Sequence, residues 1–270
     1  MPTNINQIIA AYVPSKASDV ALALAHNLSE KYDARLTIIN VNPEKSKPGE
    51  VKEGIDSVMG EDPKSYGFVE KVGKPYKEIL MLEKAINGDL IVMGSHGSKE
   101  RDPEWIGGNA FKVLSGSSCP VLILPKEYHG NDFSNIVLPL SYTSETRQKV
   151  TLAVDLAQKY NAVVHILLVH KDEEPQTLHK LKIYSDQVKK HCENKEVAFE
   201  FKEIYNKNIA TACIEYANEV KADLICIMSE RESPLSLFLG NYAQQLVNET
   251  NIPVLTVHSV DYQIVGEAGY

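Results

Sequence analysis

The sequence predicts an α/β protein built from two tandem copies of one domain, each with an open five-stranded parallel sheet flanked by helices. Short apolar runs alternate with amphipathic segments along the chain, which is typical of parallel strands joined by crossover helices. The pattern also repeats. GDLIVM at 88–93 returns as ADLICIM at 222–228, and SCPVLIL at 118–124 returns as NIPVLTV at 251–257. Such a repeat indicates a duplicated domain that starts over near Ser134.

The elements within each copy follow from the apolar periodicity and from the residues that start and stop helices. Ser18 is predicted to cap the first helix, whose apolar residues recur at helical spacing. Pro75 is predicted to open a later helix of the same copy. Strands are predicted in the first copy at 8–13, 36–41, 66–72, 90–93 and 121–124. Strands are predicted in the second copy at 135–140, 163–169, 196–204, 224–228 and 254–257.

Composition excludes several classes of partner. The formal net charge of −8 and the absence of a basic patch argue against nucleic acid, because phosphate backbones repel an acidic surface. No apolar run has membrane-spanning length, and the first residues do not resemble a signal peptide, so we expect a cytoplasmic protein without a membrane partner. The four cysteines form no C-x-x-C pair. We therefore expect reduced, buried thiols and no metal site.

One loop of the first copy carries the signature of a binding site. The fourth predicted strand ends in Met93-Gly94-Ser95-His96-Gly97, and after nine intervening residues Gly107-Gly108-Asn109 opens a helix. Glycines let backbone N–H groups approach a ligand without a Cβ in the way. A helix N-terminus adds free N–H donors and partial positive charge, which suits phosphate. His96 either contacts such a phosphate or stays in solvent.

This loop resembles the nucleotide loop of the universal stress protein family, G-x2-G-x9-G-[S/T], and Cys119-Pro120-Val121-Leu122 resembles that family's closing strand. The resemblance covers nearly the whole chain. It implies the adenine nucleotide alpha hydrolase-like fold and an ATP site, with or without magnesium. It also implies domains that pair through their fifth strands, here 121–124 and 254–257, as an intramolecular pseudo-dimer. Further homodimerisation stays open. The nucleotide-site residues that it implies are Pro14, Ser15, Val41, Met93, Gly94, His96, Gly97, Gly107, Gly108 and Asn109.

The first copy departs from the family pattern in three places. Val13 stands where the family has an aspartate at the end of strand one, and Gly108 stands where it has serine or threonine. The connecting loop, 98–106, is acidic where the family is often basic. Trp105 in that loop either covers a ligand or packs against protein. We therefore expect a regulatory protein without catalytic residues that binds an adenine nucleotide. The alternatives are a structural or partner-binding module without ligand and, less favoured, a weak ATPase.

The second copy is expected to bind no nucleotide. Ser229, Glu230 and Glu232 stand near positions where the first copy has glycines, and carboxylates there would repel phosphate. Of the loop signature, only Gly240-Asn241 remains. The expected domains are 1–130, with the nucleotide-type loop, and 131–260, with the degraded loop, followed by a C-terminal tail at 261–270.

Overall fold

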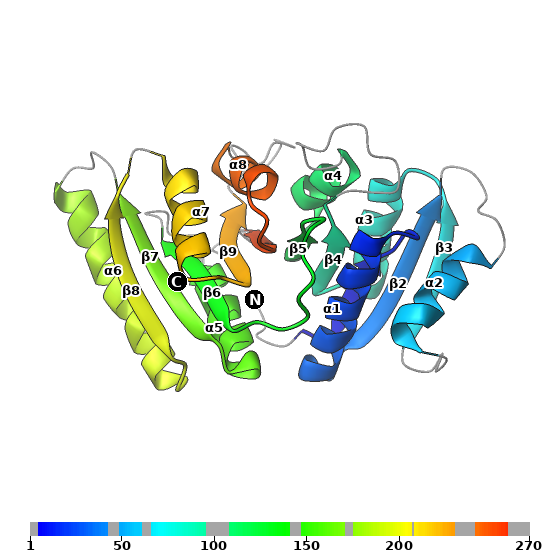
Figure 1. Cartoon of the computed structure of the whole chain (residues 1–270), viewed down its shortest axis with the longest axis horizontal. Coiled ribbons are helices and arrows are strands. Elements are labelled where there is room, and N and C mark those ends of the chain that lie inside the picture. Colours follow the sequence, from blue (N-terminus) through cyan, green and yellow to red (C-terminus); the bar gives the residue numbers. More distant parts are fainter. Residues whose placement is uncertain are drawn as a thin grey trace, which may run out of the picture.

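The computed structural model describes residues 5–42, 49–60, 66–95, 108–140, 147–170, 175–206, 208–229 and 241–258. Their ten strands form one sheet in the order β3-β2-β1-β4-β5-β10-β9-β6-β7-β8 (Figure 1). Each half of this order holds the five strands of one copy, and all strand pairs within a half are parallel. The predicted fold class is therefore confirmed.

The two halves contain the same elements in the same order. The first half consists of β1 (Gln7–Ala11), α1 (Lys16–Tyr32), β2 (Arg35–Asn42), α2 (Glu50–Met59), β3 (Tyr66–Val72), α3 (Pro75–Ile86), β4 (Leu90–Gly94), α4 (Gly108–Gly116) and β5 (Val121–Leu124). The second half consists of β6 (Asn135–Leu140), α5 (Arg147–Tyr160), β7 (Val163–His170), α6 (Pro175–Asn194), β8 (Phe199–Tyr205), α7 (Ile209–Glu219), β9 (Leu224–Ser229), α8 (Asn241–Glu249) and β10 (Val254–His258).

The halves join through their fifth strands. β5 and β10 are antiparallel, and Leu122 lies opposite its own counterpart, Leu255. The Thr256 hydroxyl adds a hydrogen bond of 3.1 Å to the carbonyl of Val121. The junction therefore has the local symmetry of a two-fold dimer interface, which confirms the pairing of 121–124 with 254–257 that the family resemblance implies.

Helices α1 and α5 repeat this symmetry beside the sheet. The Tyr32 hydroxyl donates to Asp155 at 2.6 Å, and the Tyr160 hydroxyl donates to Asn27 at 2.6 Å. Tyr32 and Tyr160 end equivalent helices, so these contacts form a reciprocal pair. Burial, reinforced by Asp155, raises the pKa of Tyr32 and keeps the hydroxyl a donor.

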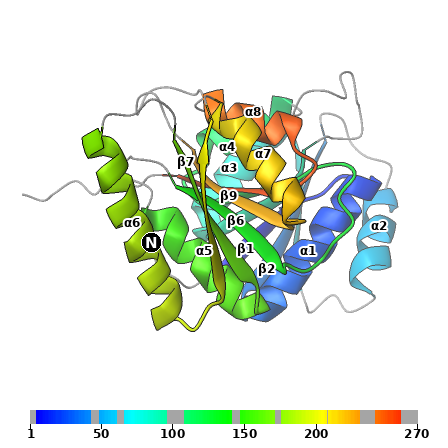
Figure 2. The same ribbon diagram turned by 60° about the vertical axis from the view of Figure 1, so that its left-hand side comes forward.

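Helices cover both faces of the sheet (Figures 1 and 2). One core contains side chains of α1, α2, α5 and α6, and the other contains side chains of α3, α4, α7 and α8. Alternate strand residues enter opposite cores. Ile9 and Ile91 belong to the second core, for example, while Ile8 and Leu90 belong to the first. Within the described residues, no helix is both long and apolar enough to cross a bilayer.

Two details of the predicted elements are wrong. The N-cap of α1 is Ser15 rather than Ser18, because the Ser15 hydroxyl accepts from the Ser18 N–H at 3.3 Å. The strand predicted from 196 begins only at Phe199, since Glu196 has a φ of 55° and lies in the turn that follows α6. The helix predicted to open at Pro75 is confirmed.

An equivalent aspartate in each half accepts hydrogen bonds from the backbone where an inner strand begins. Asp89 Oδ2 accepts from the backbone N–H groups of residues 6–7 at 2.8 and 2.9 Å. Asp223 Oδ2 accepts in the same way from residues 134–135 at 2.8 and 3.0 Å. These contacts align Gln7 with Asn135 and so fix which residues of the two halves are equivalent.

Candidate functional site

The predicted nucleotide site lies at the carboxyl edge of the first half, where β1, β2 and β4 end side by side. In the sheet register, Ala11 at the end of β1 lies opposite Ile39 of β2 and Met93 of β4. Ligands of open parallel sheets bind at this edge. His96, Gly97 and Gly107 lie outside the described residues, as does Trp105.

Val41 and Met93 are buried apolar residues at this edge. Their exposed fractions are 4% and 7%, and both belong to the core on the α3 and α4 side of the sheet. Gly94 is the last residue of β4, and the next backbone N–H, of Ser95, donates to the Leu124 carbonyl at 2.8 Å. The chain is therefore held to β5 until just after Gly94.

Ser15 is engaged in local structure. Its hydroxyl oxygen accepts the capping hydrogen bond of α1, and Pro14 and Ser15 are half-buried. The turn after β1 is therefore fixed by a helix cap. A ligand there would meet a hydroxyl whose oxygen already accepts one bond from the backbone.

The first residues of α4 are exposed within the described part of the chain. Gly108 and Asn109 are exposed, and the first turn of this helix carries no acidic residue. A Cβ built on Gly108 meets no atom of the described residues within 4 Å. The first N–H groups of a helix lack partners within that helix, so this end offers donors to an anion.

A buried polar network at the same edge escaped the sequence analysis. The fully buried Asn40 donates to the Tyr12 carbonyl at 2.8 Å, and Asn42 donates to Asn40 Oδ1 at 2.9 Å. The Tyr12 hydroxyl in turn donates to Asp19 of α1 at 2.9 Å. Burial, with a smaller contribution from Asp19, raises the pKa of Tyr12. The sequence feature that could have indicated this network is Asn-x-Asn at the end of an otherwise apolar strand.

The equivalent edge of the second half lacks this network and carries a different buried polar pair, Ser229 and His258 at the ends of β9 and β10. The alignment of Gln7 with Asn135 makes Leu140 the counterpart of Tyr12, and the sheet register makes Leu168 the counterpart of Asn40. Both leucines are buried. The buried Lys149 donates to the Pro139 carbonyl on this side. The degraded loop itself, 230–240, lies outside the described residues.

Neither metal ligation nor thiol chemistry is indicated within the part of the chain that the structure describes. No group of three or more His, Cys, Asp or Glu side chains there is arranged to hold a metal ion. All four cysteines are free and buried, as predicted. Burial raises the pKa of Cys119 and Cys226 to about 12, and that of Cys192 and Cys213 to about 11. These thiols stay protonated at neutral pH and are poor nucleophiles.

The comparisons with known proteins agree with this architecture. The model of the universal stress protein family matches residues 4–125 and again residues 132–258. A universal stress protein of Methanocaldococcus jannaschii is 27% identical over 136 residues, which cover 42% of this chain and 80% of that protein.

Two solved structures share the whole two-part fold. A universal stress protein from Archaeoglobus fulgidus superposes with a TM-score of 0.69 at 17% identity, covering 96% of this chain and 98% of its own. A putative universal stress protein from Pseudomonas aeruginosa has a TM-score of 0.73 at 15% identity, covering 95% and 94%. The family match spans both halves and nearly all described elements, so this chain belongs to the universal stress protein family.

Proposed function

We propose that the first half binds an adenine nucleotide, ATP above all, in a regulatory and non-catalytic role. The adenine would lie against Val41 and Met93, and the phosphates would meet the glycine loop and the start of α4. Gly94, Gly97, Gly107 and Gly108 would bring the backbone close, with Pro14, Ser15, His96 and Asn109 around them. The free, buried cysteines support a reducing, cytoplasmic location.

The observation that carries this proposal is the difference between the two carboxyl edges. The first half has the polar Tyr12–Asn40–Asn42 network at its carboxyl edge, where the second half has Leu140 and Leu168 in place of Tyr12 and Asn40. Buried polar groups are costly unless they are well paired, so the presence of this particular network in the first half supports a ligand site there. We propose that the second half binds no nucleotide and completes the pseudo-dimer.

Two substitutions at Gly108 test this proposal by isothermal titration calorimetry with ATP and magnesium. Gly108→Asp places a carboxylate at the start of α4, where it favours the helix but repels phosphate. Gly108→Ser supplies a hydroxyl donor instead. Neither side chain meets an atom of the described residues, so both variants should fold. We expect one ATP site per chain, at least tenfold weaker binding in Gly108→Asp, and equal or tighter binding in Gly108→Ser.

The outcomes separate the proposal from its alternatives. If wild type and Gly108→Ser both show no heat and no change in melting temperature at millimolar ATP, the chain is a structural or partner-binding module. Steady phosphate release that Gly108→Asp abolishes would instead identify a weak ATPase. Equal ATP affinity in all three proteins would place the nucleotide elsewhere.

A further inference from the structure

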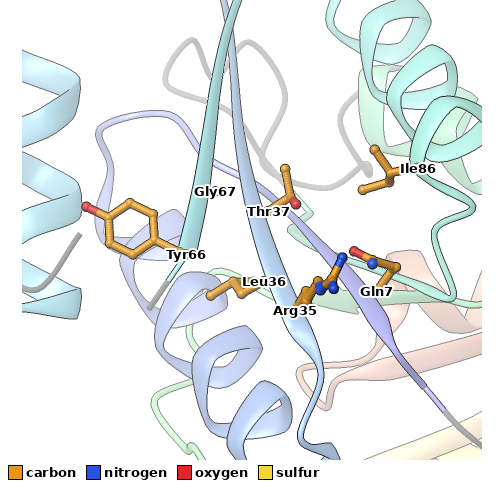
Figure 3. A pocket seen from close by; sticks show the side chains of 7 residues that line it. All are labelled: Gln7, Arg35, Leu36, Thr37, Tyr66, Gly67 and Ile86. Carbon is orange, nitrogen blue, oxygen red and sulfur yellow. The ribbon is translucent and has the colours of Figure 1, made fainter. Parts of the chain in front are cut away.

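A cavity of about 620 Å³ opens at the other end of the first half, where β1, β2 and β3 begin (Figure 3). We call it the base cavity. Its walls include Gln7, Arg35, Thr37 and Gly67 from these strands and Ile86 from the end of α3. The proposed nucleotide site lies at the carboxyl ends of β1 and β2, together with that of β4. The base cavity therefore lies at the opposite edge of the sheet and is a separate place.

Three polar side chains line the base cavity without a partner among the described residues. Figure 3 shows Arg35, Thr37 and Gln7 on the same side of the sheet as Ile86, while Leu36 and Tyr66 point to the other side. Among the described residues, none of the three polar side chains has a hydrogen bond or ion pair, and no acidic residue lines the cavity. Gln7 and Thr37 are half-buried and Arg35 is exposed, so a ligand from solvent can reach all three.

The second half fills the same place with its own side chains. Thr37 pairs with Gly67 across β2 and β3, and the equivalent pair across β7 and β8 is His165 and Glu200. His165 Nε2 lies 3.1 Å from Asn135 Oδ1, and Nδ1 lies 3.6 Å from Glu200 Oε2. His165 Nδ1 also lies 3.3 Å from the Tyr216 hydroxyl of α7.

The helices complete this contrast. The same backbone hydrogen bond follows the last turn of α3 and of α7, which aligns the two helices residue by residue. In this alignment Leu82 is the counterpart of Tyr216. In the second half, therefore, larger polar side chains pair with one another and occupy the space. In the first half, threonine, glycine and leucine at these positions leave a cavity, and its polar groups have no partner within the described part of the chain.

We propose that the base cavity binds a small molecule that carries a carboxylate or phosphate group. Arg35 supplies the planar N–H fork that matches such oxyanions, and no acidic side chain among the described residues lines the cavity beside it. The Thr37 hydroxyl and the Gln7 amide bind further polar atoms of the ligand, and Ile86 contacts its apolar part. The cavity volume suits a small ligand.

The proposal is tested by two-dimensional amide NMR on the full chain, titrated separately with succinate and with glycerol phosphate. We expect saturable shifts of the Gly67 backbone amide and the Gln7 side-chain amide with at least one probe. The probe that saturates first identifies the oxyanion. Two variants should weaken binding at least tenfold. Arg35→Gln removes the guanidinium fork, and Gly67→Glu places a carboxylate in the cavity at the position that is Glu200 in the second half.

Gly67→Glu should fold, because a Cβ at Gly67 makes only ordinary contacts, the nearest with Thr37 Oγ1 at 3.5 Å. Lys71→Gln is the matched control, since it removes one positive charge from the exposed part of β3 outside the cavity. Gly108→Asp should leave these shifts unchanged, which separates this site from the nucleotide site. The proposal is overturned if neither probe shifts Gly67 at about 10 mM, a concentration that reveals even weak sites. It is equally overturned if Arg35→Gln and Lys71→Gln weaken binding alike.

Discussion

At the scale of single residues, one buried carboxylate holds the turn between α4 and β5. Glu83 has an exposed fraction of 2%. Its Oε1 accepts from the N–H and hydroxyl of Ser118 at 2.7 and 2.6 Å, from the N–H of Cys119 at 2.9 Å, and from the Ser117 hydroxyl at 3.2 Å. Its Oε2 is buried without a hydrogen-bond partner among the described residues. The turn therefore depends on one strongly accepting oxygen.

Replacing this carboxylate should destabilise the fold without touching either proposed site. Glu83→Gln weakens four hydrogen bonds by removing the charge, and it buries an amide donor where Oε2 has no partner. We expect a loss of about 1–3 kcal/mol in the free energy of unfolding, measured by urea denaturation. The exposed Glu30→Gln is the control and should change stability by less than about 0.5 kcal/mol. Equal stability of the two variants would show that the turn does not need the charge.

Sequence reasoning at this scale succeeds where a residue acts on its nearest neighbours. Pro75 at the start of α3 and the buried cysteines were predicted from local preferences alone. The cap of α1 was misplaced by three residues, because Ser15 and Ser18 have similar capping preferences and only backbone geometry selects between them. The partners of Glu83 were beyond reach, since they lie more than thirty positions away along the chain.

At the scale of elements, β7 carries a buried histidine that links three neighbouring segments. His165 has an exposed fraction of 4% and faces Asn135 of β6, Glu200 of β8 and Tyr216 of α7. Burial lowers its pKa below the ordinary value, and Glu200 opposes this only in part. Burial also lowers the pKa of His191 in α6, with a smaller contribution from Lys195. Both imidazoles therefore resist protonation in the folded state.

This arrangement predicts that acid weakens the fold. As the pH falls through about 6.5, the histidine is protonated in the unfolded chain but stays neutral in the folded one. Because the unfolded state then binds more protons, the free energy of unfolding decreases from pH 7.5 to 5.5. One such group contributes at most about 1.4 kcal/mol per pH unit. Urea denaturation at both pH values should show a smaller decrease for His165→Gln than for wild type. The exposed His129→Gln should keep the full decrease. If His165→Gln kept it as well, the imidazole would not be responsible.

Strands were predicted more closely than the segments between them. The inner strands are buried on both faces and therefore read as continuous apolar runs, so their positions agree within one or two residues. The helix α2 lies in a polar stretch rich in glycine and proline. Only Val51 and Ile55 of α2 are buried, and two apolar residues are too few to define a helical period.

At the scale of the whole molecule, duplication gives one continuous sheet with two unlike halves. The edges of β5 and β10 are occupied by each other, so any pairing with a second chain must use another surface. The halves share strand order, junction and starting carboxylates, yet they differ at both edges of the sheet. The repeat in the sequence predicted the shared features. The open base cavity and the polar network of Asn40 emerge only when the strands are aligned side by side, because their residues come from several elements.

The central claim is that this chain belongs to the universal stress proteins and uses only its first half to bind nucleotide. The most direct measurement is a crystal structure of the full chain grown with ATP and magnesium. We predict one nucleotide per chain, with its adenine beside Val41 and its phosphates at the start of α4 near Gly108. Nucleotide density at the carboxyl edge of the second half, beside Leu140 and Leu168, would contradict the claim. A crystal without nucleotide in either half at saturating ATP would contradict it equally.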